Sequence, residues 1–478
     1  MKQVVALLLC ACMLLAVLAG CAGKTTPEAD GTPNANDQEA SNETQTPSAA
    51  GQEGESAGPV ELGLMLWEAS EAETEPIDRG IANYEEASGN TVTKSTVAWS
   101  EYHGKLRTLM AADNAPDVFW LNPEYQVDFI LDGQICDLTE LVNTAYDWDD
   151  FIPASQQKMM YTDAEGESHI YGVDVCDVGT MFFYNVDMFE AAGYSQDDMP
   201  LTEDEMWTWD EFIQIMQDVT QYDENGNVTV YGTTNFEEPM SLYSTLEMLT
   251  SAGANWFNDD FTEAVGMTSD PTIEVLSKIK SLRTEYGVAP DPNVIGVSTN
   301  LSAIQQFANK QVASIYIGSY SLCELATYEG INYDVCLPPK ITDNYNYSPI
   351  CSANLYYIWA HTKHYNEAAE FLQFLTSDDF GVALYKSGLW MPNKLSAYDG
   401  PIEEYMAGDI YPEHWDELLW RFTSADCRWF DHMVNTEQVY DVTQYYLEDY
   451  FYNDADLVDS LTNMQDEVNA LMSEVYNG

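Results

Sequence analysis

Basic residues are scarce in this chain of 478 residues, which has 17 Lys and Arg against 80 Asp and Glu and a formal net charge of −63. A chain this acidic repels nucleic acid and anionic lipid surfaces, so neither is expected as a partner. The charge suits a neutral or a cationic ligand. We interpret most of it as a solvated surface that keeps the protein soluble.

Motifs that signal catalysis or a bound metal are also missing. The sequence has no G-x-S-x-G, H-E-x-x-H or P-loop pattern. His361 and His364 are the only close histidine pair, and no carboxylate pattern flanks them. Residues 223–227 superficially resemble a calcium loop, but the glycine is at the wrong position, so a hairpin turn is the better interpretation. We therefore expect no catalytic activity, no cofactor and no metal.

The N-terminus has the pattern of an export signal. Lys2 precedes an almost wholly apolar run over residues 4–20, as in a cleavable signal peptide. Residues 18–21, Leu-Ala-Gly-Cys, resemble the lipobox of bacterial lipoproteins. That resemblance implies a diacylglyceryl group on the Cys21 sulfur, cleavage after Gly20 and acylation of the new amino terminus. Two acyl chains anchor a protein stably where one would be marginal. The alternative is a plain N-terminal anchor with an incidental cysteine.

Large apolar side chains are absent from the next segment. Residues 22–59 contain no Val, Ile, Leu, Met, Phe, Trp, Tyr or Cys, so they cannot bury enough apolar surface to fold. We expect a disordered tether with an end-to-end distance of roughly 35 Å. Together with the lipobox, it implies a protein held at the extracellular face of the cytoplasmic membrane, in a cell of the Gram-positive type.

Cysteines beyond the N-terminal region are few and widely spaced. The six that remain permit disulfides, because their number is even and the chain is expected to be exported. None has the C-x-x-C spacing, and most lie in apolar runs, so buried free thiols are an equal alternative. The six are Cys136, Cys176, Cys323, Cys336, Cys351 and Cys427.

From Val60 onward, short apolar runs alternate with helical patterns. Strands are predicted over 60–67, 90–98 and 117–121, with helices over 77–88 and 102–110 between them. This βαβαβ order predicts a parallel sheet covered by helices. Ligands bind such sheets outside the carboxyl ends of the strands. The residues at those ends are Trp67, Glu68, Trp99, Trp120 and Asn122.

Helix signals continue along the chain. Thr208 and Glu211 have the spacing of a capping box, so a helix is predicted to begin at that point. Further helices are predicted over 270–286 and 366–376, and a strand over 311–317.

A set of short motifs runs in a fixed order from about residue 60 to 395. They include 115–120 (APDVFW), 132–139 (DGQICDLT), 183–189 (FYNVDMF), 208–212 (TWDEF), 307–310 (FANK), 317–320 (IGSY) and 368–377 (AAEFLQFLTS). In this order the set resembles the extracellular solute-binding proteins of carbohydrate ABC importers, the group that includes maltose-binding protein. Two features depart from the family. Tyr320 stands where the family often has Trp, and residues from about 398 onward follow none of its patterns.

The resemblance implies an α/β fold of the periplasmic-binding-protein type II, with two discontinuous lobes and a ligand cleft between them. The expected first lobe comprises 60–177 plus 351–397, and the second 178–350 plus 398–478. Closure of the lobes around the ligand is the expected motion. The implied partners are a small-molecule solute, most simply a carbohydrate, and the permease subunits of an ABC transporter. We expect a monomer.

Aromatic rings stack on the C–H faces of sugars, while amides and carboxylates hold the hydroxyls. The resemblance implies a ligand site at Trp67, Glu68, Trp99, Tyr102, Trp120, Asn122, Tyr184, Asn235, Trp256, Tyr320, Asn354 and Trp390.

Each of these positions has a structural alternative. Trp67, Trp256 and Trp390 are favoured as stacking platforms, whereas Trp120 and Tyr184 fit a core equally well.

Nearby positions are interpreted as structural. Asn185 is expected to cap a turn, Trp209 to pack, and Asp117 to hold its turn. Arg421, Arg428 and Trp429 form a late cluster that would either contact a ligand or neutralise nearby acid.

These features favour capture of a sugar or oligosaccharide and its delivery to an ABC importer. One alternative is a binding protein for a cationic solute, such as a polyamine or a peptide. A surface enzyme acting on glycosides is a weaker alternative, because with 80 acids some carboxylates must be close by chance. A purely structural surface lipoprotein would not require the ordered motifs.

Overall fold

The computed structural model describes residues 58–67, 71–163, 166–237, 243–291, 301–406, 410–424 and 433–476. Some residues of the sequence predictions lie outside the described part, namely Cys21, Glu68, Cys427, Arg428, Trp429 and almost all of the predicted tether. No helix in the described part of the chain is long and apolar enough to cross a membrane.

The first part of the fold is the predicted βαβαβ unit. Its elements are β1 (Glu61–Trp67), α2 (Glu71–Ser88), β2 (Thr91–Val97), α3 (Trp99–Ala111) and β3 (Val118–Leu121). Strand β1 pairs in parallel with both β2 and β3, which confirms the parallel sheet. Helix α2 begins before the predicted residue 77 and ends where Gly89 adopts a φ of 76°. An L-residue with a side chain rarely adopts this φ, so glycine suits the helix end.

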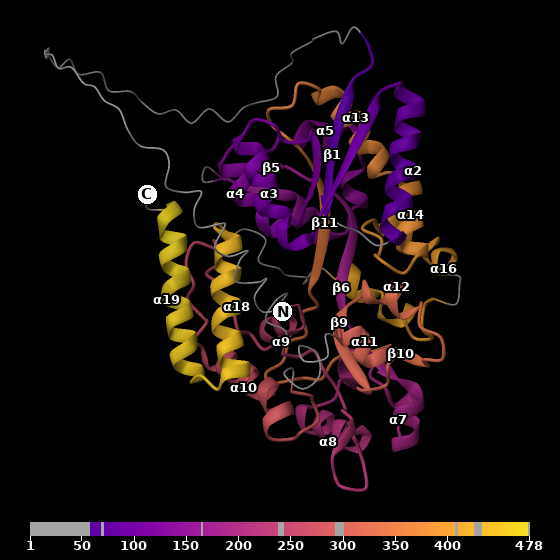
Figure 1. Ribbon diagram of the computed structural model, residues 1–478, viewed down its shortest axis with the longest axis vertical. Coiled ribbons are helices and arrows are strands. Elements are labelled where there is room, and N and C mark those ends of the chain that lie inside the picture. Colours follow the sequence, from indigo (N-terminus) through magenta and orange to yellow (C-terminus); the bar gives the residue numbers. More distant parts are fainter. Residues whose placement is uncertain are drawn as a thin grey trace, which may run out of the picture. The chain divides into compact units, whose positions relative to one another are not determined.

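Two strands that are distant in sequence extend this sheet. They are β11 (Cys351–Ile358), antiparallel to β3, and β6 (Val173–Asn185), antiparallel to β11. Residues 173–179 of β6 pair with β11, and residues 180–185 pair with β9 (Ser314–Gly318) on one side and β10 (Tyr333–Cys336) on the other. Strand β6 therefore joins two sheet regions, and Figure 1 shows it running between them beside β11.

Three hydrophobic cores surround these sheets. Core A contains β1, β3, β11 and the first half of β6, with side chains such as Leu64 and Phe119. In the second half of β6, alternate side chains point to opposite faces, as the pleat of a strand requires. Phe182 and Tyr184 enter core B, whereas Met181 and Phe183 enter core C. The β9–β6–β10 region is thus covered on both faces.

The helices and short strands fill in around this framework. Around core A lie η1 (Pro123–Tyr125), α4 (Gln126–Leu131), α5 (Thr139–Ala145), α6 (Pro153–Met159), β4 (Met160–Thr162), β5 (Ser168–Ile170), α13 (Tyr365–Leu375) and α14 (Asp378–Lys386). Cores B and C are built with α7 (Val186–Ala192), α8 (Trp209–Val219), β7 (Gln221–Tyr222), β8 (Val228–Val230), α9 (Tyr243–Ser251), α10 (Asp270–Thr284), α11 (Ala303–Ala308), α12 (Ser321–Leu325), α15 (Leu395–Tyr398), α16 (Ile402–Tyr405) and α17 (Trp420–Thr423).

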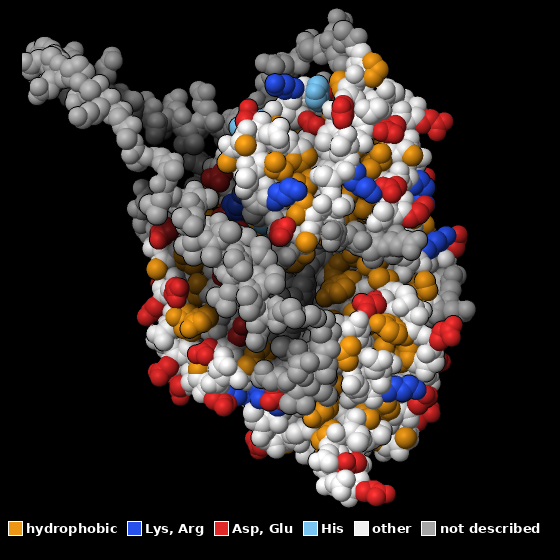
Figure 2. Space-filling view, in the orientation of Figure 1, with side chains coloured by type: hydrophobic (Ala, Val, Ile, Leu, Met, Phe, Trp, Pro, Cys, Tyr) orange, Lys and Arg blue, Asp and Glu red, His pale blue; other side chains and the backbone are white. Residues whose placement is uncertain are grey.

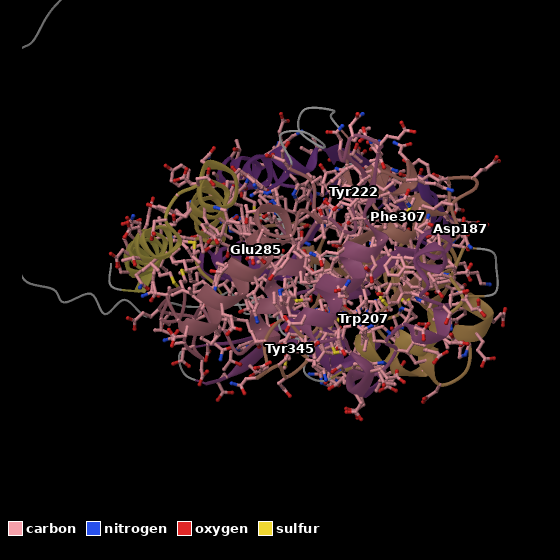
Figure 3. All side chains as sticks on the ribbon, turned by 90° about the horizontal axis from the view of Figure 1, so that it is seen from below. Asp187, Trp207, Tyr222, Glu285, Phe307 and Tyr345 are labelled. Carbon is pink, nitrogen blue, oxygen red and sulfur yellow. The ribbon has the colours of Figure 1, made fainter. Side chains whose placement is uncertain are left out.

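Several local predictions are confirmed. Thr208 Oγ1 accepts from the backbone N–H of Glu211, and the Glu211 carboxylate accepts from the Thr208 N–H at 2.8 Å, which completes the capping box. Strands β7 and β8 form the predicted hairpin. Of the two alternatives left open for the cysteines, Cys136, Cys176 and Cys336 show the free thiol. Figure 3 shows the described side chains from below and labels Trp207 of core B and Phe307 of core C.

The C-terminal region, which matched no sequence pattern, ends in two long helices. These are α18 (Thr436–Asn453) and α19 (Leu457–Tyr476), which pack against each other and lie side by side in Figure 1. Their apolar side chains, including Leu447, Phe451 and Met464, belong to core B. The helical hairpin is therefore an integral part of that core.

Candidate ligand-binding site

Four tryptophans gather at the carboxyl ends of β1, β2 and β3. The Trp67 ring centroid lies 4.6 Å from that of Trp120 and 5.2 Å from that of Trp99. Trp390, which is distant in sequence, approaches Trp120 at 5.7 Å. The predicted Tyr102 joins them, with its ring 5.5 Å from Trp67. Five of the predicted site residues thus form one aromatic cluster at the edge of the sheet where ligands of such folds bind.

Tyr102 holds the strand ends of this cluster in place. Its buried hydroxyl donates to the backbone oxygen of Trp120 at 2.7 Å and contacts that of Met65 at 3.1 Å. Burial raises the pKa of Tyr102 well above its ordinary value, so the phenol stays protonated. Tyr102 therefore joins β1 to β3 directly below the tryptophans.

The cluster continues through His103, which sequence reasoning did not identify. The His103 ring stacks on Tyr125 at 3.9 Å and meets the Trp99 ring edge-on at 5.2 Å. Burial lowers the pKa of His103 to about 3, and the nearby Arg107 lowers it further. The imidazole is therefore neutral at physiological pH. Its position one turn after Trp99 on α3 is the signal that could have identified it.

Three buried polar atoms of this region have no hydrogen-bond partner among the described residues. They are Trp120 Nε1, Asn122 Oδ1 and His103 Nε2. An unpaired buried polar atom is costly, and such atoms in native proteins call for an explanation. They comprise a donor, an acceptor and a neutral imidazole nitrogen, a set that matches the hydroxyls of a neutral polar ligand.

Exposure differs among the rings. The Trp99 side chain is 49 % exposed, whereas Trp67 and Trp390 are buried and Trp120 is wholly buried. Trp99 is thus the ring of the cluster that is most open to a ligand in this structure. Trp120 also packs on Tyr356 of β11, at 5.5 Å, so part of its role is in core A.

Three other predicted residues lie away from this cluster. Tyr184 and Trp256 are buried in core B. The Tyr184 hydroxyl contacts Asp334 at 3.3 Å, and the Trp256 indole N–H donates to Thr272 Oγ1 at 3.2 Å. Asn235, with a φ of 73°, donates from its side chain to the backbone oxygen of Tyr316. All three have structural contacts in this arrangement, and the aromatic cluster does not include them.

Tyr320 and Asn354 are further predicted site residues, one following β9 and the other within β11. Tyr320 follows β9, yet its side chain packs against core A. A Cβ at Gly318 would lie 2.1 Å from Tyr320 Cε1, so a glycine is needed where this ring crosses the backbone. Asn354 stands at a register shift of β11, and its amide donates to Cys176 Sγ at 3.7 Å.

The residues interpreted as structural have structural contacts. Asn185 Oδ1 accepts from the Met188 N–H at 3.0 Å, which caps α7 as expected. Trp209 is buried in core B. Asp117 accepts from Gly63 N at 2.8 Å and from the Thr362 hydroxyl, so it joins β1 to a distant loop and not its own turn.

Arg421, left open between a ligand contact and charge neutralisation, is buried against Glu247. Arg421 Nη2 lies 2.9 Å from Glu247 Oε1, and the two side chains are 2 % and 0 % exposed. Because both side chains are buried, Arg421 neutralises Glu247, and this favours the second of the two interpretations over a ligand contact.

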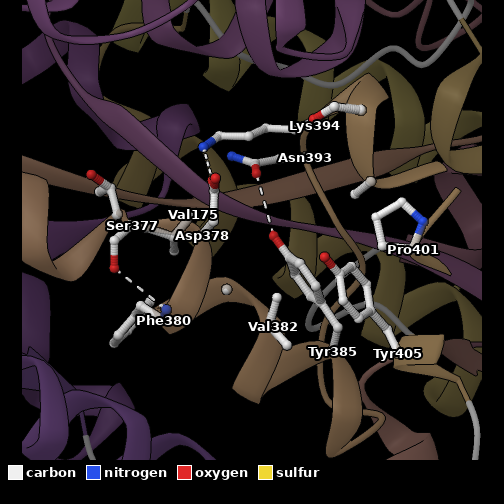
Figure 4. Close-up of a pocket in the computed structure, with 14 residues that line it drawn as sticks. Val175, Ser377, Asp378, Phe380, Val382, Tyr385, Asn393, Lys394, Pro401 and Tyr405 are labelled. Atoms are coloured by element: carbon white, nitrogen blue, oxygen red, sulfur yellow. Dashed lines mark hydrogen bonds and ion pairs between the residues drawn. The ribbon is translucent and has the colours of Figure 1, made fainter. Parts of the chain in front are cut away.

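A separate pocket of about 200 Å³ lies beside β6, lined by residues of α14 and of the segment that follows it (Figure 4). Lys394 pairs with Asp378 at its rim, and the Tyr385 hydroxyl reaches Asn393 Oδ1 at 3.5 Å. None of the predicted site residues lines it. Figure 2 draws one face of the molecule, on which acidic side chains are many and basic side chains few, as the composition predicts.

The sequence and the fold together identify the class of protein. Residues 80–407, more than half of the chain, match the family model of the bacterial extracellular solute-binding proteins, and the chain belongs to this family. The family is one of binding proteins. No curated protein sequence matches the chain.

Solved structures share the two-lobed fold at low sequence identity. An ABC substrate-binding protein of Listeria monocytogenes, in complex with cycloalternan, has a TM-score of 0.71 and 20% identity, covering 87% of this chain and 100% of its own. A solute-binding protein of Thermotoga lettingae, bound with alpha-D-tagatose, has 0.70 and 19%, covering 86% and 99%. Maltose-bound MalE3 of T. maritima has 0.69 and 19%, covering 86% and 100%. The chain therefore has the two-lobed α/β fold of these proteins.

Proposed function

We propose that this protein captures a sugar or an oligosaccharide between two lobes and delivers it to an ABC importer. The observation that carries the proposal is the cluster of Trp67, Trp99, Trp120 and Trp390 at the carboxyl ends of the parallel strands. Flat rings offer stacking surfaces for the apolar faces of sugar rings. The unpaired atoms of Trp120 and Asn122 add neutral hydrogen-bonding groups.

The three solved structures described above were determined with sugars bound, and this supports a carbohydrate over a cationic solute. A cation would be better served by carboxylates at the centre of the site. The described residues of the cluster are instead neutral and aromatic, with His103 kept neutral by burial. Of the other expected ligand contacts, the proposal keeps Tyr102, Tyr320, Asn354 and the undescribed Glu68. Tyr184, Asn235 and Trp256 have structural contacts away from the cluster.

The proposed lobes are 60–177 plus 351–397 and 178–350 plus 398–478. The partner change of β6 supports this division, because its pairing with β11 ends at Gly179 and its pairing with β9 begins at Thr180. Cores A and B divide at the same place. Residues near 177–180 and 351 would then act as the hinge of lobe closure.

The N-terminal lipid completes the proposal. Acylation at Cys21 would keep the protein at the outer face of the membrane, near its permease, while the tether lets it collect ligand. The composition of residues 22–57, which lack large apolar side chains, is the observation behind the proposed tether.

A thermal-shift screen tests the ligand. Residues 21–478 carrying Cys21→Ser would be melted with maltose, maltotriose, tagatose, cycloalternan and spermidine. A ligand at a hundred times its Kd adds about 2.7 kcal/mol of stability. We expect a sugar to raise the Tm and spermidine to leave it unchanged. If spermidine alone raises the Tm, the carbohydrate proposal is wrong and the ligand is a cationic solute.

A further inference from the structure

The α18–α19 hairpin is anchored in core B and so moves with the second proposed lobe. Its apolar residues, such as Val439 and Leu461, pack in core B. Polar contacts add to this, since Asn469 exchanges two hydrogen bonds with the backbone of Ala264, at 2.7 and 2.9 Å. Lys280 of α10 also donates to the backbone oxygen of Tyr450 at 2.6 Å.

The first turn of α18 contacts the other proposed lobe. The Asn435 N–H donates to Asp128 Oδ1 at 2.7 Å, and Thr436 Oγ1 donates to the backbone oxygen of Glu124 at 2.7 Å. Asp128 also accepts from Arg107 at 2.9 Å. Thr436 is fully buried and Asp128 is 9 % exposed, so these are sheltered contacts and not surface pairs.

This contact lies on the ligand side of the hinge. Glu124 and Asp128 belong to η1 and α4, which directly follow the carboxyl end of β3 and the Trp120–Asn122 segment. The Tyr125 ring, stacked on His103, reaches the Tyr440 ring of α18 at 6.1 Å. An aromatic path therefore runs from the candidate site to the C-terminal hairpin.

We propose that the first turn of α18 is an interlobe clasp that holds the lobes together. Asn435 and Thr436 bond to Asp128 and Glu124, while Arg107 pairs with Asp128 from its own side. The inference rests on the proposed closure of two lobes. Opening about the β6–β11 hinge must break contacts on the ligand side, so the clasp favours the closed arrangement before a ligand arrives. A contact that favours the binding-competent arrangement raises ligand affinity without touching the ligand.

Small-angle X-ray scattering of the ligand-free protein tests the clasp. In residues 21–478 with Cys21→Ser, Thr436→Val removes one donor and keeps the shape, and Arg107→Gln removes the charge beside Asp128. Thr245→Val is the matched control, because Thr245 is equally buried and donates to Phe236 within core B. Arg79→Gln, in an exposed pair with Glu75, is the second control.

We expect both clasp variants to have a larger radius of gyration than the parent, and both controls to match it. The affinity for the sugar found in the melting screen should fall by about 3- to 10-fold per removed hydrogen bond. Unchanged scattering in both clasp variants would overturn the clasp, and unchanged affinity would overturn its link to binding. If no sugar shifts the melt of the parent, the proposed function fails, whereas the ligand-free scattering still decides on the clasp.

Discussion

The buried pair of Glu247 and Arg421 offers a sharp test of the fold around the hinge. Glu247 accepts from Arg421 at 2.9 and 3.0 Å, from the Tyr347 hydroxyl at 3.0 Å and from the Ile350 N–H at 3.1 Å. Arg421 in turn donates to the Thr180 backbone oxygen. Thr180 follows the last β11-paired residue of β6, and Ile350 precedes β11. The pair thus connects the two strands of the proposed hinge.

Glu247→Gln keeps the shape but leaves the Arg421 guanidinium buried without its counter-charge. Breaking a buried pair from one side costs about 3–5 kcal/mol, because the remaining charge is uncompensated. Replacing both residues, as in Glu247→Gln with Arg421→Met, removes that charge and should recover much of the loss.

Urea unfolding of both variants measures this difference. Arg79→Gln is the control, since its exposed pair with Glu75 contributes little. If Glu247→Gln unfolds at the same urea concentration as this control, or if the double variant is the less stable of the two, the reasoning about the buried charge is wrong.

Three further predictions concern other parts of the chain. Burial, with a further contribution from Asp177, raises the pKa of Asp174 to about 7, although Ser155 lowers it. The free energy of unfolding that this proton contributes is fully present below the unfolded pKa of about 3.9 and is lost as pH rises toward 7. Asp174→Asn should therefore be more stable than the parent above pH 7 in urea unfolding, and equal pH profiles of the two proteins would contradict this. Thr208→Ala removes the cap of α8 and should lower the free energy of unfolding by about 1 kcal/mol in the same assay. Unchanged stability would show that the cap does not stabilise the helix. Cys21→Ala should abolish incorporation of labelled palmitate and release the protein from membranes, and continued labelling would place the lipid elsewhere.

Local sequence signals were sufficient for much of the fold. The periodicity of Tyr102, Leu106 and Met110 places them on the buried side of α3, and the capping box at Thr208 marks the start of α8. These features depend on residues a few positions apart, so one sequence contains the whole signal. The carboxyl-end rule likewise brought together Trp67, Trp99 and Trp120, because parallel strands end at one edge.

Features that depend on distant pairing could not be predicted in the same way. The apolar run around β6 does not reveal that its side chains serve core A first and then alternate between cores B and C. His103 and Tyr125 stack only because α3 and η1 meet in space. The burial of Trp256 against Thr272 depends on a helix formed later in the chain. A tryptophan before a loop looks the same in sequence whether it stacks on a ligand or on the core.

Trp120 and Trp256 allow the two roles to be separated. Both are buried tryptophans, but Trp120 Nε1 has no partner among the described residues, whereas the Trp256 indole N–H donates to Thr272. Changing either to Phe removes the N–H together with part of the ring. If Trp120 Nε1 binds a ligand hydroxyl, Trp120→Phe should weaken sugar binding by about 0.5–1.5 kcal/mol in hydrogen bonding alone.

Trp256→Phe should leave sugar affinity unchanged and lower the Tm more than Trp120→Phe, because it leaves Thr272 without its indole donor in core B. Isothermal titration with the sugar from the melting screen, beside ligand-free melts, measures both quantities. The opposite pattern, with affinity lost in Trp256→Phe and kept in Trp120→Phe, would move the stacking site from the strand ends of core A to core B. Since both changes remove the same atoms from buried rings, the general cost of lost packing is matched, and the difference isolates the role of the indole N–H.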